Sequence, residues 1–278
     1  MRPKNRKSRP ASKKKETPMR EELLGALSDA GIGSGDIVFV HSDVAPVIAA
    51  GNIFKSRETL SILTECFLEV VGKQGTLVVP AFNYDFCRGA AYSHEKSPSQ
   101  VGLWSNHVLQ DPRAKRSFHP IFSAAAIGAN AADLTRGVSK SSFGEDSLFH
   151  RLHEQNAKLV FFNASFYYCT FIHYAEQKIG VDYRFLKTFT GSVSVSGAEK
   201  MDSFDFYARY LDRDVVLDLT RLEKELLADG RMKRSFFREA PILGVRCADV
   251  FDEAVLRVKS DPYYLLKHPP KCQTQPSS

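Results

Sequence analysis

The chain has 278 residues, of which 43% are apolar and 25% are charged, a composition typical of globular proteins. Its five cysteines have no regular spacing and no CxxC pair, which argues against a secreted disulfide framework and a zinc knuckle. No apolar run reaches the roughly 18 residues that span a bilayer, and the basic start lacks the apolar region of a signal peptide. We therefore expect a cytoplasmic protein without a membrane span or a bound metal.

The net charge of +6 is concentrated at the N-terminus. Residues 1–15 hold eight of the 38 Lys and Arg residues and no acid, which leaves 30 basic and 32 acidic residues elsewhere. Because such a segment has little apolar surface to bury, we expect residues 1–17 to form a disordered tail, 18–267 a single domain and 268–278 a disordered end. Nucleic-acid binding through phosphate contacts of the tail is an alternative, but the near-neutral body has no binding-fold signature.

The first half of the chain predicts alternating helices and strands. Leu23, Leu24 and Leu27 recur at helical spacing and precede Gly31, a residue typical of helix ends. The order strand, helix, strand that follows favours a parallel crossover unit. In chain order the predicted elements are a helix over 18–31, a strand over 36–41, a helix over 56–71, a strand over 75–79, a loop over 83–100, a helix over 102–110 and a strand over 121–128.

The second half adds an antiparallel portion. Its predicted elements are a helix over 146–156, a buried strand over 158–164, a helix over 171–179 ended by Gly180, antiparallel strands or a hairpin over 187–197 and 204–215, a helix over 219–230, and a strand followed by a helix over 239–262. The expected fold class is therefore α/β, with a largely parallel central sheet flanked by helices and an antiparallel C-terminal portion.

A histidine and a glutamate stand three residues apart in the sequence CTFIHYAEQKIG, 169–180. On a helix with Thr170 as N-cap, His173 and Glu176 share one face. The helix dipole disfavours the imidazolium, whereas Glu176 favours it and fixes the ring tautomer. The pair fits a general base that is neutral at rest, and it equally fits a core histidine satisfied by a carboxylate. A third alternative is a Cys–His hydrolase with Cys169 as the nucleophile.

Two further polar clusters lie beside predicted strands. His41 and Ser42 stand at the carboxyl end of the strand over 36–41, where ligands of α/β sheets collect. The second cluster consists of Arg116, Ser117, His119 and Ser123. Its donors flank a turn fixed by proline and can hold a phosphate or a carbonyl oxygen. An ordinary polar loop explains the same residues.

Five motifs occur in a fixed order, namely G-D-x-V-x-V-H-S, G-x-x-G-T-L-V-V-P-A-F, R-S-x-H-P-x-x-S-x-A-x-x-G, F-G-x-x-S and T-x-x-H-x-x-E. With them the chain resembles the aminoglycoside 3-N-acetyltransferase family from about residue 20 to residue 260. The resemblance implies an acyl-coenzyme A co-substrate and acyl transfer to a sugar amine. It also implies that His173 is the general base with Glu176 as its carboxylate, and that the two polar clusters lie near coenzyme A. Asp43 departs from the family, which usually has a small hydroxyl residue there.

The segment 176–191 indicates the nature of the acceptor. It carries three basic residues against two acids, Glu176 and Asp182, whereas a polycationic drug calls for an acidic pocket. Arginine can form two parallel hydrogen bonds to the oxygens of a phosphate group, so we predict that Arg184 contacts a diphosphate. The segment also resembles a branch of the family that acts on nucleotide-linked amino sugars for surface polysaccharide.

The remaining substrate assignments are Tyr183, next to Arg184, and two aromatic walls of the sugar site, Tyr168 and Tyr174. The alternative acceptor is an aminoglycoside antibiotic, whose acetylation confers resistance. Acyl chain length is open, and a homodimer is compatible with the sequence.

Overall fold

The computed structural model describes residues 11–51 and 56–271. Its helices are α1 (Ala11–Asp29), α2 (Ala45–Gly51), α3 (Ser56–Val71), α4 (Leu103–Leu109), α5 (Ala131–Thr135), α6 (Leu148–Glu154), α7 (Ile172–Ile179), α8 (Thr220–Ala228) and α9 (Cys247–Ser260). Two short 3-10 helices, η1 (Phe86–Arg88) and η2 (Phe166–Tyr168), lie in connecting segments. Within the described ranges, none of these helices combines the length and the apolar composition that crossing a bilayer requires.

The strands are β1 (Ile37–Ser42), β2 (Thr76–Pro80), β3 (Tyr92–Ser93), β4 (Lys115–Arg116), β5 (Ala124–Gly128), β6 (Lys158–Phe162), β7 (Arg184–Val195), β8 (Ala198–Arg209), β9 (Lys233–Phe237) and β10 (Ala240–Arg246). Seven of them form the central sheet in the order β4-β5-β2-β1-β6-β10-β9. Its centre is parallel, because β1 pairs in parallel with both β2 and β6, and antiparallel strands complete both edges. The remaining three strands form a second sheet, β3-β7-β8.

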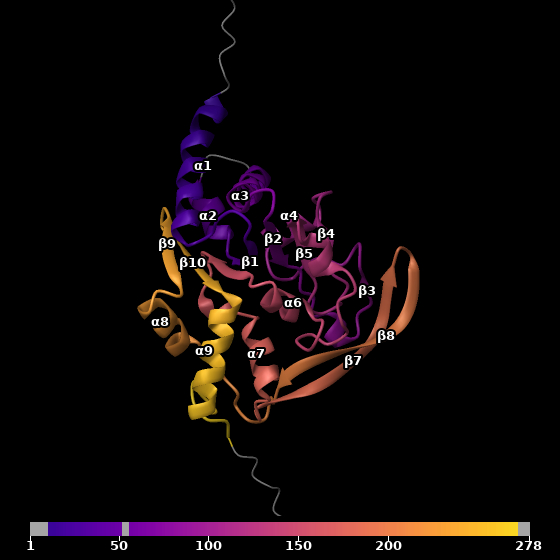
Figure 1. Ribbon diagram of the computed structural model, residues 1–278. Helices are drawn as coiled ribbons and strands as arrows, with labels where there is room; N and C mark the ends of the chain where they lie inside the picture. Colours follow the sequence, from indigo (N-terminus) through magenta and orange to yellow (C-terminus); the bar gives the residue numbers. More distant parts are fainter. Residues whose placement is uncertain (1–10, 52–55, 272–278) are drawn as a thin grey trace, which may run out of the picture.

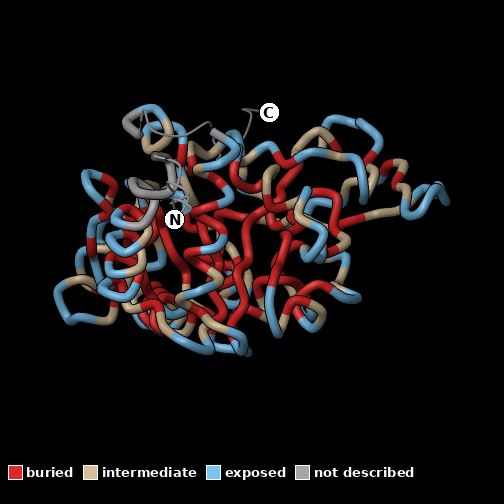
Figure 2. Tube along the Cα trace, turned by 90° about the horizontal axis from the view of Figure 1, so that it is seen from above, coloured by how far each residue is buried: buried red, intermediate tan, exposed pale blue. Residues whose placement is uncertain are grey.

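The inner strands of the central sheet, β5, β2, β1, β6 and β10, are largely buried, whereas the edge strands β4 and β9 are partly exposed. Figure 2 shows the buried strands in red at the centre of the molecule. Successive side chains of a strand point to opposite faces, and Phe39 accordingly belongs to one apolar cluster whereas Val38 and Val40 belong to another. Helices α1, α3 and α4 pack on the Val38 face, and α6, α7 and α9 lie on the other (Figure 1). Continuous apolar runs in β1 and β6 are therefore explained by burial on two sides.

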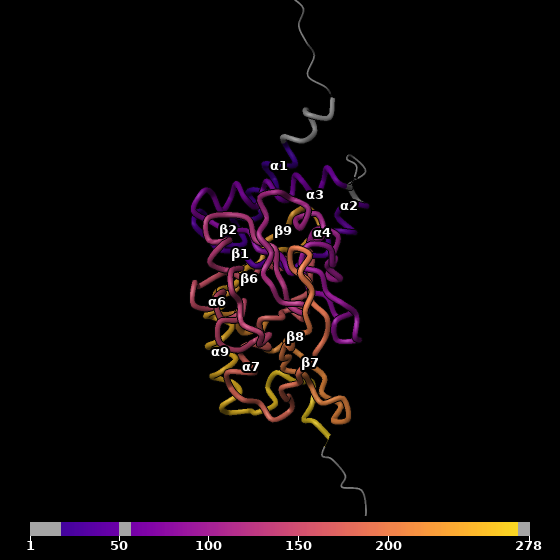
Figure 3. Tube along the Cα trace, turned by 90° about the vertical axis from the view of Figure 1, so that its right-hand side faces the viewer, coloured from indigo at the N-terminus to yellow at the C-terminus, as the bar shows by residue number. Residues whose placement is uncertain are grey.

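Strands β7 and β8 form a long antiparallel hairpin beside the body of the protein (Figure 1). Its register pairs Phe185 with Ala208 and Lys187 with Phe206, so these four side chains lie on one face of the ribbon. Figure 3 shows that the base of the hairpin is close to α7. This packing brings a face of the hairpin to the segment that carries His173.

The structure confirms the α/β class, the parallel unit around α3 and the antiparallel hairpin. The predicted bounds of α3 match the observed ones, and Gly180 ends α7 with a positive φ of 78°. Several boundaries were wrong: α1 begins at Ala11 rather than at residue 18, and β1 ends at Ser42 rather than at residue 41. The hairpin strands span Arg184–Val195 and Ala198–Arg209 rather than 187–197 and 204–215. The short elements α2, α5, β3, β4 and β9 were not predicted, because two to seven residues give too little periodicity.

The predicted terminal tails fall mainly on residues that the structure leaves out. Residues 1–10 and 272–278 lie outside the described ranges, and the backbone of 11–17 is helical. Alanine, lysine and glutamate all have good helix propensity, which explains why the helix extends toward the N-terminus. The division into tails and a domain over 18–267 stays a prediction.

Candidate active site

His173 and Glu176 meet on α7 as the spacing predicts. His173 Nδ1 lies 2.7 Å from Glu176 Oε2. The carboxylate is fully buried, whereas the histidine side chain keeps 20% of its surface exposed. Since Nδ1 is bound to the carboxylate, Nε2 is the ring nitrogen that remains for a substrate. The geometry is that of an imidazole oriented by a carboxylate.

Arg184 completes this group from the first position of β7. Its Nε lies 2.6 Å from Glu176 Oε2, the same oxygen that contacts His173, and the arginine side chain is only 5% exposed. A second nitrogen of the guanidinium donates to the carbonyl oxygen of Tyr207 at 3.4 Å. Glu176 therefore joins a cationic side chain and the imidazole within the protein interior.

The protonation states of His173 and Glu176 depend on their burial and on the charges that neighbour them. Burial tends to raise the pKa of Glu176, but Arg184 and the bond from His173 together hold it below its ordinary value. Burial lowers the pKa of His173, Arg184 lowers it further, and Glu176 acts in the opposite direction. The resting state that follows is an ionised Glu176, a cationic Arg184 and a neutral His173.

The N-terminus of α7 differs from the prediction. The helix begins at Ile172 with Phe171 in the cap position and no side-chain cap bond, so the assignment of Thr170 as N-cap was wrong. The Thr170 hydroxyl instead donates to the carbonyl oxygen of Tyr168 at 3.4 Å, and its own carbonyl accepts from His173 N. At 3.4 Å the hydroxyl bond is weak, so this donor is available to another acceptor.

A cavity of about 950 Å³ opens beside His173. One wall is the face of the hairpin that carries Phe185, Lys187 and Phe206, and the 210–217 segment forms another. The remaining lining residues nearest to the base are Tyr167, Tyr168, Cys169, Thr170 and Arg184. The sequence alone did not identify the hairpin residues as site residues. Their alternating pattern predicts a strand face, but it does not show what the face encloses.

The cavity lining is more basic than acidic. Arg184, Lys187 and Arg209 line it together with one acid, Asp212. Because Arg184 is already paired with Glu176, the remaining balance is two cations against one carboxylate. Such a lining does not favour a polycation and does favour a ligand with negative groups.

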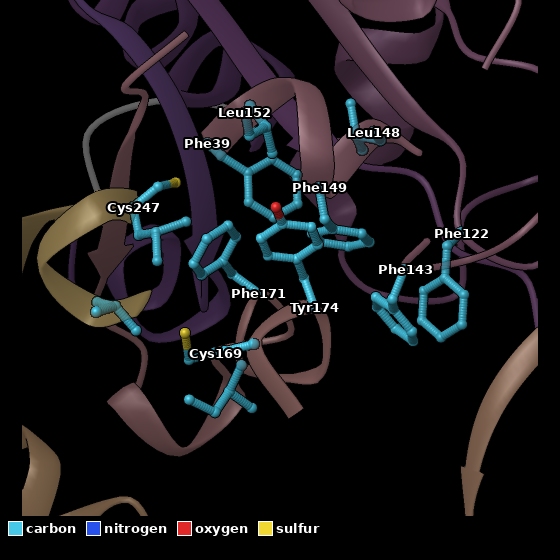
Figure 4. Packing of buried hydrophobic residues seen from close by; sticks show 14 of the residues in the cluster. Phe39, Phe122, Phe143, Leu148, Phe149, Leu152, Cys169, Phe171, Tyr174 and Cys247 are labelled. Atoms are coloured by element: carbon cyan, nitrogen blue, oxygen red, sulfur yellow. The ribbon is translucent and has the colours of Figure 1, made fainter. Parts of the chain in front are cut away.

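The predicted substrate residues divide between the cavity and the core. Tyr168 lines the cavity and is 62% exposed, as a wall residue requires. Tyr183 is fully buried and is not part of the lining. Tyr174 lies in the core among other aromatic rings (Figure 4), and its hydroxyl contacts His153 Nδ1 at 3.2 Å. The proposed role of Tyr174 as a sugar wall was therefore wrong, because its ring packs among aromatic side chains. Arg184 faces Glu176 rather than open solvent.

Cys169 does not have the properties of a nucleophile. Its side chain is 1% exposed and lies in the apolar cluster with Phe171 (Figure 4). Burial raises the pKa of its thiol to about 12. A reactive cysteine needs a thiolate and an accessible sulfur, so the geometry does not support the Cys–His hydrolase alternative.

His41 and Ser42 occupy the carboxyl end of β1, as predicted. The His41 ring stacks on Phe161 with 5.2 Å between ring centroids, and its Nε2 is buried without a hydrogen-bond partner among the described residues. Burial lowers the pKa of His41 to about 3. Neither residue lines the cavity beside His173. Asp43, the departure from the family motif, accepts from Ala45 N at 3.3 Å at the start of α2.

The second polar cluster is hydrogen-bonded within the protein. Arg116 donates to the carbonyl oxygens of Ser97 at 2.7 Å and His94 at 2.9 Å, and to Ser123 Oγ at 3.2 Å. His119 Nδ1 accepts from the backbone of residues 121 and 122, and Ser117 Oγ accepts from Ala124 N. These contacts give every member a role in the fold. Their assignment to coenzyme A stays a prediction.

No set of three or more His, Cys, Asp or Glu side chains in the described ranges is arranged to hold a metal ion. His150 and His153, the nearest histidine pair in sequence, are used otherwise. His150 Nδ1 accepts from Asp146 N at 3.0 Å, and His153 contacts Tyr174.

Comparison with known proteins gives one family. Residues 40–259 match the model of the family described as aminoglycoside 3-N-acetyltransferase. Aminoglycoside N(3)-acetyltransferase IX of Micromonospora chalcea is 26% identical over 205 residues, 64% of this chain and 68% of the relative. Aminoglycoside N(3)-acetyltransferase IV of a Salmonella species is 25% identical over 261 residues, 91% of each chain. A solved structure of AAC-IIIb in binary complex with CoASH has the same fold, with a TM-score of 0.74, 19% identity, and coverage of 87% of this chain and 96% of the other.

Proposed function

Because the chain belongs to the aminoglycoside 3-N-acetyltransferase family, we propose that it transfers an acetyl group from acetyl-coenzyme A to an amine of an amino sugar. The observation that carries this proposal is His173, held at 2.7 Å by the buried carboxylate of Glu176 at the wall of a large cavity. The co-substrate is supported by the CoASH complex of a protein with the same fold.

The chemistry is a direct transfer with His173 as the general base. The acceptor nitrogen attacks the thioester carbonyl, a C–N bond forms, and the C–S bond then breaks to release coenzyme A as a thiolate. His173 Nε2 takes the proton that the attacking amine loses, and Glu176 stabilises the imidazolium that results. No covalent enzyme intermediate is needed, because both substrates bind together. A cavity of about 950 Å³ lies at the upper end of the usual range for ligand sites, about 300–1,000 Å³.

The tetrahedral intermediate of this reaction carries an oxyanion that needs a donor. The Thr170 hydroxyl lines the cavity next to His173 and makes one long bond of 3.4 Å within the protein. We therefore assign the Thr170 hydroxyl as a hydrogen-bond donor to the oxyanion. Removal of a donor of this kind usually lowers kcat by about 100- to 1,000-fold. Tyr168 then borders the acceptor at the mouth of the cavity.

One observation favours a second acceptor class, a nucleotide-diphosphate-linked amino sugar. The cavity offers Lys187 and Arg209 against Asp212, a charge balance that suits phosphate groups better than a polycation. In this form of the proposal Lys187 and Arg209 replace Arg184 as the phosphate ligands, because Arg184 is engaged by Glu176. The names of the relatives favour the aminoglycoside acceptor.

Steady-state kinetics with acetyl-coenzyme A and both acceptor classes tests the proposal. Release of coenzyme A is followed with a thiol reagent, and mass spectrometry of the acceptor shows whether it has gained an acetyl group. Acetylation of a gentamicin-type drug with none of the nucleotide sugar selects the first acceptor, and the reverse result selects the second. Coenzyme A release without acetylation of any amine contradicts both.

A further inference from the structure

Oε2 of Glu176 is shared by two side chains from different elements. His173 approaches it from α7 with 2.7 Å between Nδ1 and the oxygen, and Arg184 approaches it from β7 with 2.6 Å between Nε and the oxygen. The Glu176 carboxylate has no exposure to water, and the Arg184 side chain is only 5% exposed. An isolated buried carboxylate is unstable as an ion, so the arginine supplies the charge that keeps Glu176 ionised.

The base also needs Arg184 for a second reason. If Glu176 faced His173 alone, the stable state of the pair would be a carboxylate next to an imidazolium. That state cannot accept the proton of an amine. Because the Arg184 guanidinium already neutralises the charge of Glu176, the carboxylate stabilises an imidazolium less strongly. The His173 ring then stays neutral until it accepts the proton of the attacking amine.

We propose that Arg184 is a positioning residue of the acyl transfer, which fixes Glu176 against the His173 ring and keeps that ring uncharged before the substrates react. The inference rests on the proposed role of His173. It assigns to Arg184 a function that differs from contact with an anionic substrate, although the residue borders the same cavity.

The other titratable and charged groups around His173 come from each neighbouring element. Cys169 precedes α7, Lys178 lies on it, and Tyr183 leads into β7. The hairpin and the segment after it contribute Lys187, Tyr207, Arg209, Tyr210 and Asp212. Arg184 and Glu176 are the charges that act on the pKa of His173, with burial the larger cause. A change at Arg184 is therefore distinguishable from a general change in the charge of the site.

The decisive variant is Arg184→Met, measured by nuclear magnetic resonance and by kinetics. Loss of the positive charge should move the titration of His173 to higher pH, and the acidic limb of kcat/KM should move with it. Below the titration of the variant His173 we expect kcat/KM to fall by about tenfold for each pH unit by which that titration rises, since only the neutral ring acts as a base. The loss should shrink at about pH 8.5, where even the variant histidine becomes neutral. Arg184→Lys should keep the His173 titration near the wild-type pH.

Two controls keep the test independent of folding and of the substrate. Lys178→Met removes a positive charge from the same helix and should leave the His173 titration unchanged. If Arg184→Met does not fold, the double variant Glu176→Gln/Arg184→Met removes both buried charges, and its His173 should titrate at higher pH than that of Glu176→Gln alone. The resonance measurement needs no substrate, so it tests Arg184 even if no acceptor is acetylated. An unshifted His173 titration in folded protein, or a loss of activity that is the same at every pH, overturns the proposal.

Discussion

His173 Nδ1 and Glu176 Oε2 lie 2.7 Å apart on a single helix. The contact determines which nitrogen of the ring is free for chemistry, since Nδ1 is occupied and His173 borders the cavity. It also explains how a short sequence motif can specify a histidine–carboxylate pair, because residues three apart on a helix are neighbours before any tertiary contact forms.

Replacing His173 with Ala should lower kcat for amine acetylation by about 100- to 10,000-fold, the contribution of a general base. Thermal unfolding of the variant, measured alongside, establishes that the protein is folded. Cys169→Ala serves as the matched control, and it should keep most of the activity, because the Cys169 thiol is buried and protonated. An inactive Cys169→Ala enzyme together with an active His173→Ala enzyme would reverse the two assignments.

Glu176→Gln should reduce the free energy of unfolding by about 3–5 kcal/mol, because it leaves the Arg184 charge buried without its partner. Urea denaturation at pH 7 measures this change. The double variant Glu176→Gln/Arg184→Met should recover part of the loss, since no unpaired charge remains. If the loss of unfolding free energy in the double variant equals the sum of the losses in Glu176→Gln and Arg184→Met, the two residues are not coupled.

The same pair makes stability depend on pH at the acidic side. The folded-state pKa of Glu176 is lower than that of the unfolded chain. Its contribution to stability is therefore present above the ordinary pKa of a glutamate, about 4.3, and is lost as the pH falls through the folded value. Unfolding free energies measured between about pH 7 and pH 3 should fall less steeply for Glu176→Gln than for the natural protein. Parallel curves would contradict the assignment.

His41→Phe tests whether His41 serves the fold or coenzyme A. The ring stacks on Phe161 and its Nε2 is unpartnered within the described residues, so phenylalanine should change the stability at pH 7 by no more than about 1 kcal/mol. The folded pKa of about 3 is lower than the ordinary 6.5. Stability from this histidine is thus fully present above pH 6.5 and falls with acidification. Between roughly pH 6 and 4, the free energy of unfolding should therefore fall less steeply for the variant than for the natural protein, by about 1.4 kcal/mol per pH unit.

Kinetics of the same variant complete the test. An unchanged KM for acetyl-coenzyme A assigns His41 to the sheet, whereas a KM increase of about tenfold or more, roughly 1.4 kcal/mol of binding, at unchanged stability assigns it to coenzyme A.

Arg116→Met should destabilise the protein more than it affects the binding of coenzyme A. The substitution removes part-buried hydrogen bonds from a charged donor to the carbonyl oxygens of Ser97 and His94, and such bonds contribute about 1.5–3 kcal/mol each. Arg113→Met is the control, because Arg113 forms exposed ion pairs with Glu65 and Asp111 that contribute about 0–1 kcal/mol. Urea denaturation compares the two variants. Full stability of Arg116→Met with weakened coenzyme A binding would restore the role in co-substrate binding.

The sequence by itself determined the elements with clear periodicity and the motif on α7. Alternating apolar patterns predicted antiparallel strands, and the continuous apolar runs of β1 and β6 predicted buried strands. The pairing of His173 with Glu176 could be predicted for the same reason, since it depends on local geometry alone.

The tertiary structure decided the partners that come from distant parts of the chain. Arg184 was predicted to contact phosphate because the sequence shows its charge but not the residue that it pairs with. Only the packing of β7 beside α7 places it against Glu176. The same holds for Arg116, whose donors are taken up by carbonyl oxygens about twenty residues away. Sequence patterns report which side chains can donate or carry charge. Which acceptor each one meets depends on how strands and helices pack, and that is settled by burial of the whole apolar surface rather than by any single segment.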